Sequence, residues 1–402
     1  MIRPTTPARR RLFRPMAYLV AILATLLAAT TPASAASIRS QQWYLDALHI
    51  PQAQEISTGR GVTVAVIDSG VDGGHPDLKG QITGGKCLQG FDDVQKPTED
   101  LDGHGTAMAG IIAAKGNGQD HALGVAPDAK IMPICMLTDD SAPGPAIRAI
   151  GEGIRWATDH GATVVSISLG SDHSVMSSDM EAIKSAVAYA QGHNVVIVAA
   201  TGNLPDAKHV ITPAALPGVV AVAGTTKSGA AWKGATTGKQ VALSAPATGI
   251  VSTDTLGRAH DLHPTGYRTG TGTSDATAIV SGVAALVRAK YPKLDAANVI
   301  NRLIRTADHK GAAGRNDQYG YGIVDPVKAL TADVPTVHGN PLGQLAAASA
   351  SPSASSAGGH GAAAPSTGGG SALPWIIAVV VAIVLAAVVV IVVATQRRRR
   401  SF

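Results

Sequence analysis

The chain has 402 residues, 45% of them apolar, so it is long enough for one large domain with additional segments. Its formal net charge is +5, but nine arginines and no acidic residues lie in 1–36 and 396–402, which leaves −4 for the residues between. The basic excess belongs to the two ends of the chain, and a nucleic-acid partner is therefore excluded.

The first 36 residues have the three parts of a secretory signal peptide. Arginines precede an apolar stretch over 18–29, and Ala33-Ser34-Ala35 offers small side chains for cleavage. Because the stretch is short for a helix that crosses a bilayer, a cleaved signal is favoured over an uncleaved anchor. The exported domain is expected to begin at residue 37.

Asp68 follows the first predicted strand. Residues 62–67 form an apolar run rich in valine, which is typical of a strand buried on both faces of a parallel sheet. Open α/β sheets place their sites at the carboxyl ends of such strands. His104 lies between two glycines at the start of a small-residue helix over 106–114, so its imidazole is expected to sit on a rigid element.

Further buried strands are predicted over 163–167, 195–199 and 219–222, with helices near 146–158 and 180–191. This alternation indicates a three-layer α/β fold with a parallel sheet. Ser168, Leu169 and Gly170 follow the second strand, and Gly202 and Asn203 follow the third.

Ser274 is expected in the first turn of a buried helix that continues over 276–287. The N–H groups at the start of such a helix favour negative charge that develops there. With Asp68 and His104 it completes a set of nucleophile, base and orienting carboxylate, because a serine hydroxyl needs a positioned imidazole to become nucleophilic.

The three motifs, Val66-Ile67-Asp68-Ser69-Gly70, Gly103-His104-Gly105-Thr106 and Gly272-Thr273-Ser274, resemble in content and order the subtilisin-like serine proteases. The resemblance covers roughly 41–330 and implies a peptidase acting through the triad of Asp68, His104 and Ser274. It implies Asn203 as the side-chain donor of the oxyanion hole. It also implies a polypeptide substrate bound along Ser168, Leu169, Gly170 and Gly202.

Two residues depart from the pattern of this family. Asp275 stands after the nucleophile where an apolar side chain is usual, and Ala278 stands where proline is common. A carboxylate pointing at the oxyanion site would oppose the transition state. A pseudo-enzyme that only binds peptides is therefore an alternative to an active protease.

The carboxyl end predicts a membrane anchor. Residues 336–373 are rich in Ala, Gly, Ser and Pro and are expected to form a flexible linker. Residues 374–395 are apolar over a length that suits a transmembrane helix, and the arginines of the tail 396–402 are expected to stay in the cytoplasm. The domain would then be extracellular on a single-pass protein of the cell membrane. Ala364-Pro365-Ser366-Thr367-Gly368 resembles a cell-wall sorting signal, which is the alternative.

The amino-terminal segment 42–53, the lack of room for a pro-domain after residue 36 and the carboxyl-terminal anchor resemble the mycosins, membrane-bound subtilisin-like proteases of type VII secretion systems. This resemblance implies a peptidase domain over 37–335 that processes exported proteins, with membrane proteins of the secretion complex as partners. A mainly structural role in that complex is the alternative.

No cofactor is expected, although calcium is left open. The loop 115–121 corresponds to a calcium-binding loop in some relatives of the family, but it has different ligands and a different length here. The only cysteines, Cys87 and Cys135, cannot form a zinc site. In an exported domain they are expected to form one disulfide, with two free buried thiols as the alternative.

Overall fold

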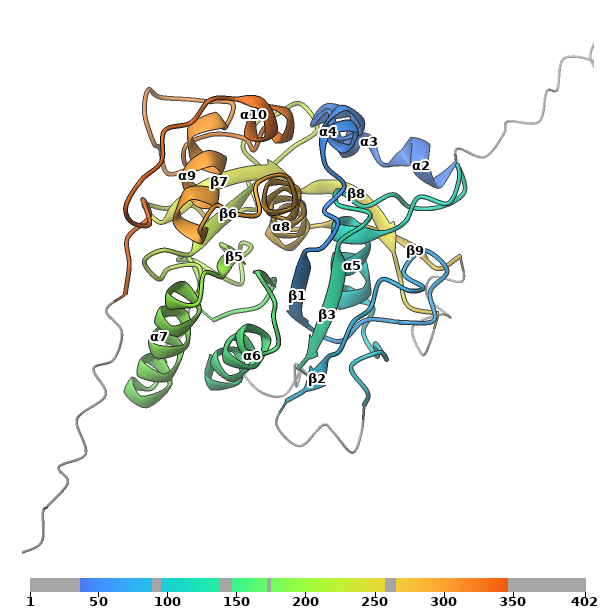
Figure 1. Ribbon diagram of the computed structural model, residues 1–402, viewed down its shortest axis with the longest axis horizontal. Helices are drawn as coiled ribbons and strands as arrows, with labels where there is room; N and C mark the ends of the chain where they lie inside the picture. Colours follow the sequence, from blue (N-terminus) through green and yellow to red (C-terminus); the bar gives the residue numbers. More distant parts are fainter. Residues whose placement is uncertain (1–36, 89–94, 137–146, 172–174, 257–264, 346–402) are drawn as a thin grey trace, which may run out of the picture. The chain divides into compact units, whose positions relative to one another are not determined.

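The computed structural model describes residues 37–88, 95–136, 147–171, 175–256 and 265–345 (Figure 1). The predicted signal peptide 1–36, the transmembrane span 374–395, the tail and most of the linker lie outside these residues. Within the described ranges, no helix combines the length and the apolar character that a membrane span requires. All described residues fall in one compact unit.

The centre of the fold is a seven-stranded sheet in which every neighbouring pair is parallel. Its strand order is β2-β3-β1-β4-β5-β6-β7. The bounds are β1 Thr63–Asp68, β2 Lys86–Cys87, β3 Lys130–Cys135, β4 Val164–Ile167, β5 Val196–Ala200, β6 Val220–Thr225 and β7 Val241–Pro246. The four predicted strands correspond to β1, β4, β5 and β6, and the parallel α/β fold is thereby confirmed.

Two layers of helices cover the sheet, one on each face, so its central strands are buried on both sides. Along β1, Val64 and Val66 pack into one hydrophobic cluster, whereas Ala65 and Ile67 pack into another on the opposite face. This alternation follows from the two-residue period of a strand. The first cluster includes side chains of α5, α8 and α9, and the second those of α6 and α7.

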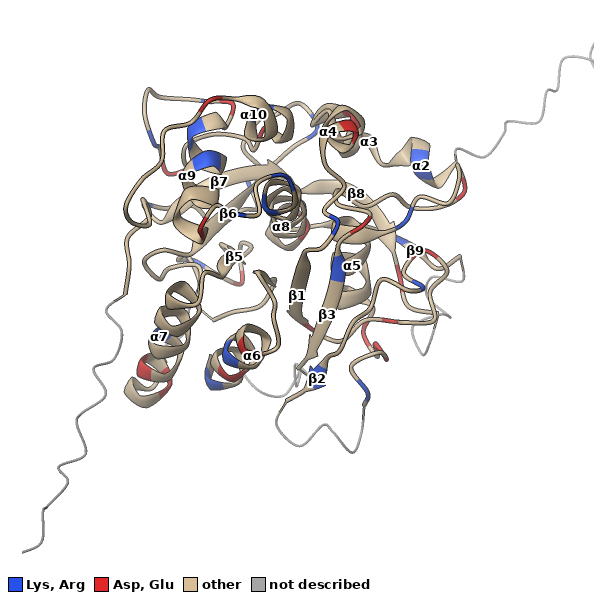
Figure 2. Cartoon of the chain, viewed as in Figure 1, with Lys and Arg blue, Asp and Glu red and all other residues tan. Residues whose placement is uncertain are grey.

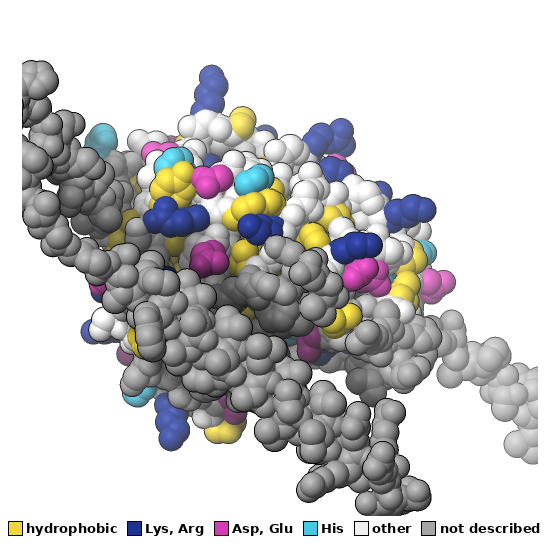
Figure 3. All heavy atoms as spheres, turned by 90° about the horizontal axis from the view of Figure 1, so that it is seen from below, with side chains coloured by type: hydrophobic (Ala, Val, Ile, Leu, Met, Phe, Trp, Pro, Cys, Tyr) yellow, Lys and Arg dark blue, Asp and Glu magenta, His cyan; other side chains and the backbone are white. Residues whose placement is uncertain are grey.

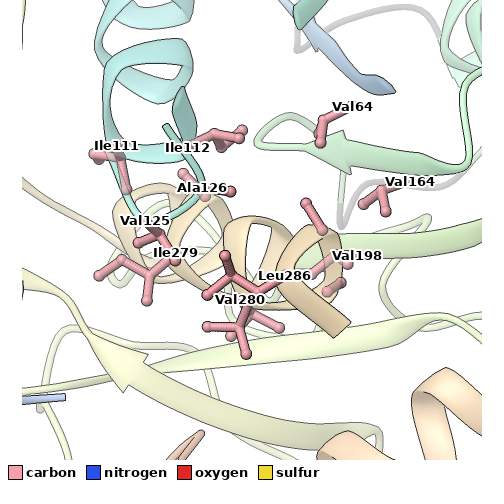
Figure 4. Close-up of a cluster of buried hydrophobic side chains, with 14 of the residues drawn as sticks. Val64, Ile111, Ile112, Val125, Ala126, Val164, Val198, Ile279, Val280 and Leu286 are labelled. Carbon is pink, nitrogen blue, oxygen red and sulfur yellow. The ribbon is translucent and has the colours of Figure 1, made fainter. Parts of the chain in front are cut away.

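The helices are α2 Ile38–Gln41, α3 Trp43–Ala47, α4 Ile50–Ile56, α5 His104–Ala113, α6 Ile147–Asp159, α7 Ser177–Gly192, α8 Thr273–Lys290, α9 Ala296–Thr306 and α10 Pro326–Thr331. α8 is buried from its first residue to Arg288. It packs on β1, β4, β5, β6 and β7 and against α5. Figure 4 shows its side chains Ile279, Val280 and Leu286 near those of α5, of the strands and of the connection that follows α5. The labelled residues from those parts are Ile111, Ile112, Val64, Val164, Val198, Val125 and Ala126.

The outer helices are amphipathic. α6 buries Ile147, Ile150 and Ile154, which recur every three or four residues, and turns its charged residues outward. Figure 2 shows charges of both signs on α6 and α7, whereas β4 to β7 carry none. On the face shown in Figure 3, basic and acidic side chains of the described residues are interspersed with separate hydrophobic ones.

A disulfide joins Cys87 of β2 to Cys135 of β3. The two residues are register partners on neighbouring parallel strands, and their Cα atoms lie 4.4 Å apart. This short separation is within the range that a disulfide requires. The prediction of a disulfide is confirmed.

Two further strands, β8 Thr248–Thr253 and β9 Tyr267–Thr271, form an antiparallel pair outside the main sheet. Tyr267 at the start of β9 donates a hydrogen bond to Asp77 Oδ2 at 2.8 Å. The same carboxylate contacts His121 Nδ1 at 2.5 Å and accepts the N–H of Ala122 at 2.8 Å. Asp77 thus links β9 to the loop 115–121, for which calcium binding was left open.

No group of three or more His, Cys, Asp or Glu side chains in the described ranges could hold a metal ion. Burial and the neighbouring carboxylate of Asp77 raise the pKa of the Tyr267 phenol, so Tyr267 remains a hydrogen-bond donor at all moderate pH values.

Tyr267→Phe is expected to lower the free energy of unfolding by about 1–3 kcal/mol, because it leaves a buried carboxylate oxygen with one donor fewer. Equilibrium denaturation followed by tryptophan fluorescence measures this change. The matched control is Tyr189→Phe, which removes an exposed hydrogen bond to Asp159 and should cost less than about 1 kcal/mol. Equal losses for the two variants would contradict the role assigned to Tyr267.

Candidate active site

Asp68 and His104 meet where β1 ends and α5 begins. His104 Nδ1 lies 2.7 Å from Asp68 Oδ1, and the same oxygen accepts the backbone N–H of Ser69 at 2.8 Å. The Asp68 side chain is 1% exposed and that of His104 is 29% exposed. The carboxylate therefore fixes the imidazole from the protein side through Nδ1.

A close approach of two backbones makes this contact possible. A Cβ atom at Gly105 would lie 2.0 Å from the carbonyl oxygen of Gly70, just past the end of β1. Only glycine fits there. The following residue, Thr106, donates its N–H and its hydroxyl to Asp100 Oδ2 at 2.9 and 2.6 Å.

Asp100 also accepts the N–H of Gly103 at 2.8 Å, so one buried carboxyl caps the first turn of α5. Burial raises the pKa of Asp100, and its hydrogen bonds from Thr106 and Gly103 oppose that rise. Asp100 was not among the predicted site residues. Its spacing before the glycine-rich start of a helix is the signal that could have identified it.

Ser274 is the second residue of α8 and is 9% exposed. Its hydroxyl donates to the carbonyl oxygen of Ser168 at 3.4 Å, and the hydroxyl of Ser168 contacts the carbonyl oxygen of Ser274 at 3.5 Å. Residues 168–170 therefore pass directly beside Ser274. β4 itself is paired on both sides, by β1 and β5, and residues 168–170 follow directly after its end.

Asn203 is oriented by the residue that precedes Ser274. Its Oδ1 accepts both the N–H and the hydroxyl of Thr273, each at 3.0 Å. This pair of donors assigns the oxygen of the amide, so the NH₂ group is the end that can face the pocket. Gly202 is held to the same threonine, whose hydroxyl lies 3.3 Å from its N–H.

His104, Asn203 and Ser274 line one pocket of about 210 Å³. The structure therefore brings three of the four predicted catalytic residues to one cavity, with Asp68 directly behind His104. The remaining wall comes from α5, from β8 and β9, which were not predicted from the sequence, and from the start of α8. Its residues are Ala107, Met108, Ile250, Ser252, Arg268, Gly270, Thr271, Gly272 and Asp275.

Asp275 is 4% exposed and packs against β9. A Cβ atom added to Gly270 of β9 would lie only 2.7 Å from Asp275 Oδ1. Burial raises its pKa to about 7, while the charges of His104 and Arg268 oppose that rise. The carboxyl thus shares the pocket with the imidazole. The negative charge of its ionised form is balanced in part by the guanidinium of Arg268.

The ionisation of His104 depends on these carboxylates. Burial alone would lower its pKa. The carboxylate of Asp68, with further contributions from Asp275 and Asp102, raises it instead to about 9. An imidazole of this basicity is a strong proton acceptor once it is neutral.

The sequence matches the Peptidase S8 subtilase family over residues 59–322. It is 35% identical to fervidolysin of Fervidobacterium pennivorans over 323 residues, which cover 75% of this chain and 45% of that relative. The chain thus spans less than half the length of fervidolysin. It is 31% identical to mycosin-1 of Mycobacterium tuberculosis over 353 residues, which cover 77% of each.

Among solved structures, the serine protease MycP1, described as an essential component of the type VII (ESX-1) secretion system, superposes with a TM-score of 0.60. That comparison has 31% identity and covers 75% of this chain and 90% of MycP1. The chain belongs to the subtilase family of subtilisin-like serine endopeptidases.

Proposed function

We propose that the chain is a membrane-anchored extracellular serine endopeptidase that processes exported proteins of a type VII secretion system. The observation that carries the catalytic part is the 2.7 Å contact of Asp68 with His104, in a pocket that also holds Ser274 and the oriented amide of Asn203. The secretion role rests on the similarity to mycosins, and the anchor on the apolar span 374–395.

In the proposed reaction, His104 Nε2 accepts the proton of Ser274 Oγ as that oxygen attacks the scissile carbonyl carbon. Asp68 holds the imidazole by Nδ1–H and stabilises the imidazolium that forms. In this structure the Ser274 hydroxyl donates to Ser168 instead. Catalytic hydrogen bonds are often longer without substrate and tighten in its complex.

The negative charge on the former carbonyl oxygen would be stabilised by the amide NH₂ of Asn203 and by backbone N–H groups at the start of α8. His104 then gives its proton to the leaving amine, and water hydrolyses the acyl-enzyme by the same path. The peptide would lie along Ser168, Leu169 and Gly170, with Gly202 on the other side of the residue that is cleaved.

A mainly structural role in the secretion complex is the second candidate, and the description of MycP1 as an essential component favours it. A cell that carries Ser274→Ala separates the two roles. Secretion that survives this change, but not deletion of the gene, would assign the structural role.

A fluorophosphonate probe is expected to label the purified full-length protein at Ser274, because Asp68 and His104 activate its hydroxyl. Ser274→Ala should abolish labelling and peptide hydrolysis, as measured by mass spectrometry and by release of a chromogenic leaving group. Ser281→Ala, on the same helix outside the pocket, is the control and should keep both. A folded wild-type protein that takes no label would refute the proposed activity and leave the peptide-binding alternative.

Asn203→Ala is expected to reduce kcat about 100- to 1000-fold with a smaller change in KM, because the lost amide acts mainly in the transition state. Steady-state kinetics on a peptide substrate measures both constants. Thr273→Val keeps the amide and removes only one donor to its oxygen, so its loss should be smaller. A loss confined to KM would contradict the oxyanion role.

The pH dependence of kcat/KM should rise toward about pH 9, because His104 accepts the serine proton only when it is neutral. Asp275→Asn removes a carboxylate that raises the pKa of His104, so the acidic limb of the profile should move to lower pH. Asp317→Asn, at an exposed ion pair with Arg315, is the control. An unchanged limb in Asp275→Asn would show that this carboxyl does not influence the base.

A further inference from the structure

The substrate side chain on the amino side of the scissile bond must enter a space beside Ser274. If the scissile carbonyl lies between Ser274 and Asn203, and the peptide runs along 168–170, that side chain points between 168–170 and 201–202. This step rests on the proposed function.

Ile211 fills this space. A Cβ atom added to Gly170 would lie 2.7 Å from Ile211 Cδ1, and one added to Gly202 would lie 3.0 Å from Ile211 Cγ2. One isoleucine side chain therefore reaches both walls. It is 8% exposed, yet it belongs to neither of the two hydrophobic clusters that cover the sheet.

The backbone around Ile211 holds this side chain in place. Its N–H donates to the carbonyl oxygen of Thr201 at 3.1 Å. The next residue, Thr212, exchanges two backbone hydrogen bonds with Ser171, at 3.0 and 3.2 Å. Ile211 therefore bridges the two segments that form the walls, and a β-branched side chain has few alternative rotamers. These hydrogen bonds fix the backbone from which the Ile211 side chain projects.

We propose that Ile211 closes the first specificity pocket, so that the enzyme cleaves after small residues, namely glycine, alanine and serine. A leucine or phenylalanine at this substrate position would have to displace the isoleucine or the carbonyl oxygen of Thr212, which lies 2.4 Å from the Cβ position of Gly170. Close packing makes such a displacement unfavourable.

The test measures kcat/KM of the full-length protein on peptide p-nitroanilides that differ only in the last residue before the anilide: alanine, leucine or phenylalanine. The wild type should prefer alanine over phenylalanine by about 100-fold, within the range by which apolar pockets discriminate. Ile211→Ala should raise the phenylalanine-to-alanine ratio about 10- to 100-fold, and Ile211→Val should raise it less.

Val210→Ala is the matched control. It truncates the neighbouring buried residue, which belongs to the second cluster, and should leave the ratio unchanged. Fluorophosphonate labelling of Ser274 counts the active molecules in every sample. Labelled wild type that prefers phenylalanine would overturn the inference and leave the proposed function intact. Absence of labelling would overturn the proposed function and the inference with it. The wild-type profile decides the matter even if Ile211→Ala does not fold.

Discussion

The site depends on how closely the start of α5 approaches the end of β1. A side chain at Gly105 would collide with the backbone of Gly70 and push His104 away from Asp68. The approach is secured from the other side of the helix, where the hydroxyls of Ser252 and Thr253 donate to backbone carbonyls of α5 at 2.8 and 2.7 Å. Asp100 adds a cap at its first turn. The geometry of the pair is thus set by backbone distance before any catalytic side chain is considered.

A core of small side chains permits this density of packing. Aromatic residues make up 3% of the chain, and the side chains around α8 are mostly alanine, valine, isoleucine and leucine. α8 can therefore pack closely on five strands, as Figure 4 shows for part of the cluster. Because Ser274 is at the buried start of this helix, its position is set by the core of the domain.

The strands that could be predicted from the sequence were those with runs made mostly of apolar residues. β1 and β5 belong to this group, and the polar residues that follow them, Asp68 and Asn203, were found in the same way. β3 contains Pro133 and begins with Lys130, and β9 is short and polar, so periodicity gave no signal for them. The contribution of β9 to the pocket, Arg268 and Gly270, was therefore missed.

The surroundings of a side chain could not be predicted either where they are formed by segments far apart in the sequence. An aspartate at position 275 is unusual for the family, but its burial against Gly270 and its effect on the pKa of His104 depend on the position of β9. Likewise, the loop compared with a calcium site holds a hydrogen-bonded contact of His121 with Asp77, which depends on residues far apart in the sequence.

The isoleucine between Gly170 and Gly202 has a consequence for the chain itself. If only small residues fit before the scissile bond, the segment 346–371, which is rich in alanine, glycine and serine, has the composition that the pocket accepts. One copy of the protein would then be a chemically suitable substrate for another. Cleavage within that segment would separate the catalytic domain from the carboxyl-terminal end and, with the anchor proposed for 374–395, would release the domain from the membrane.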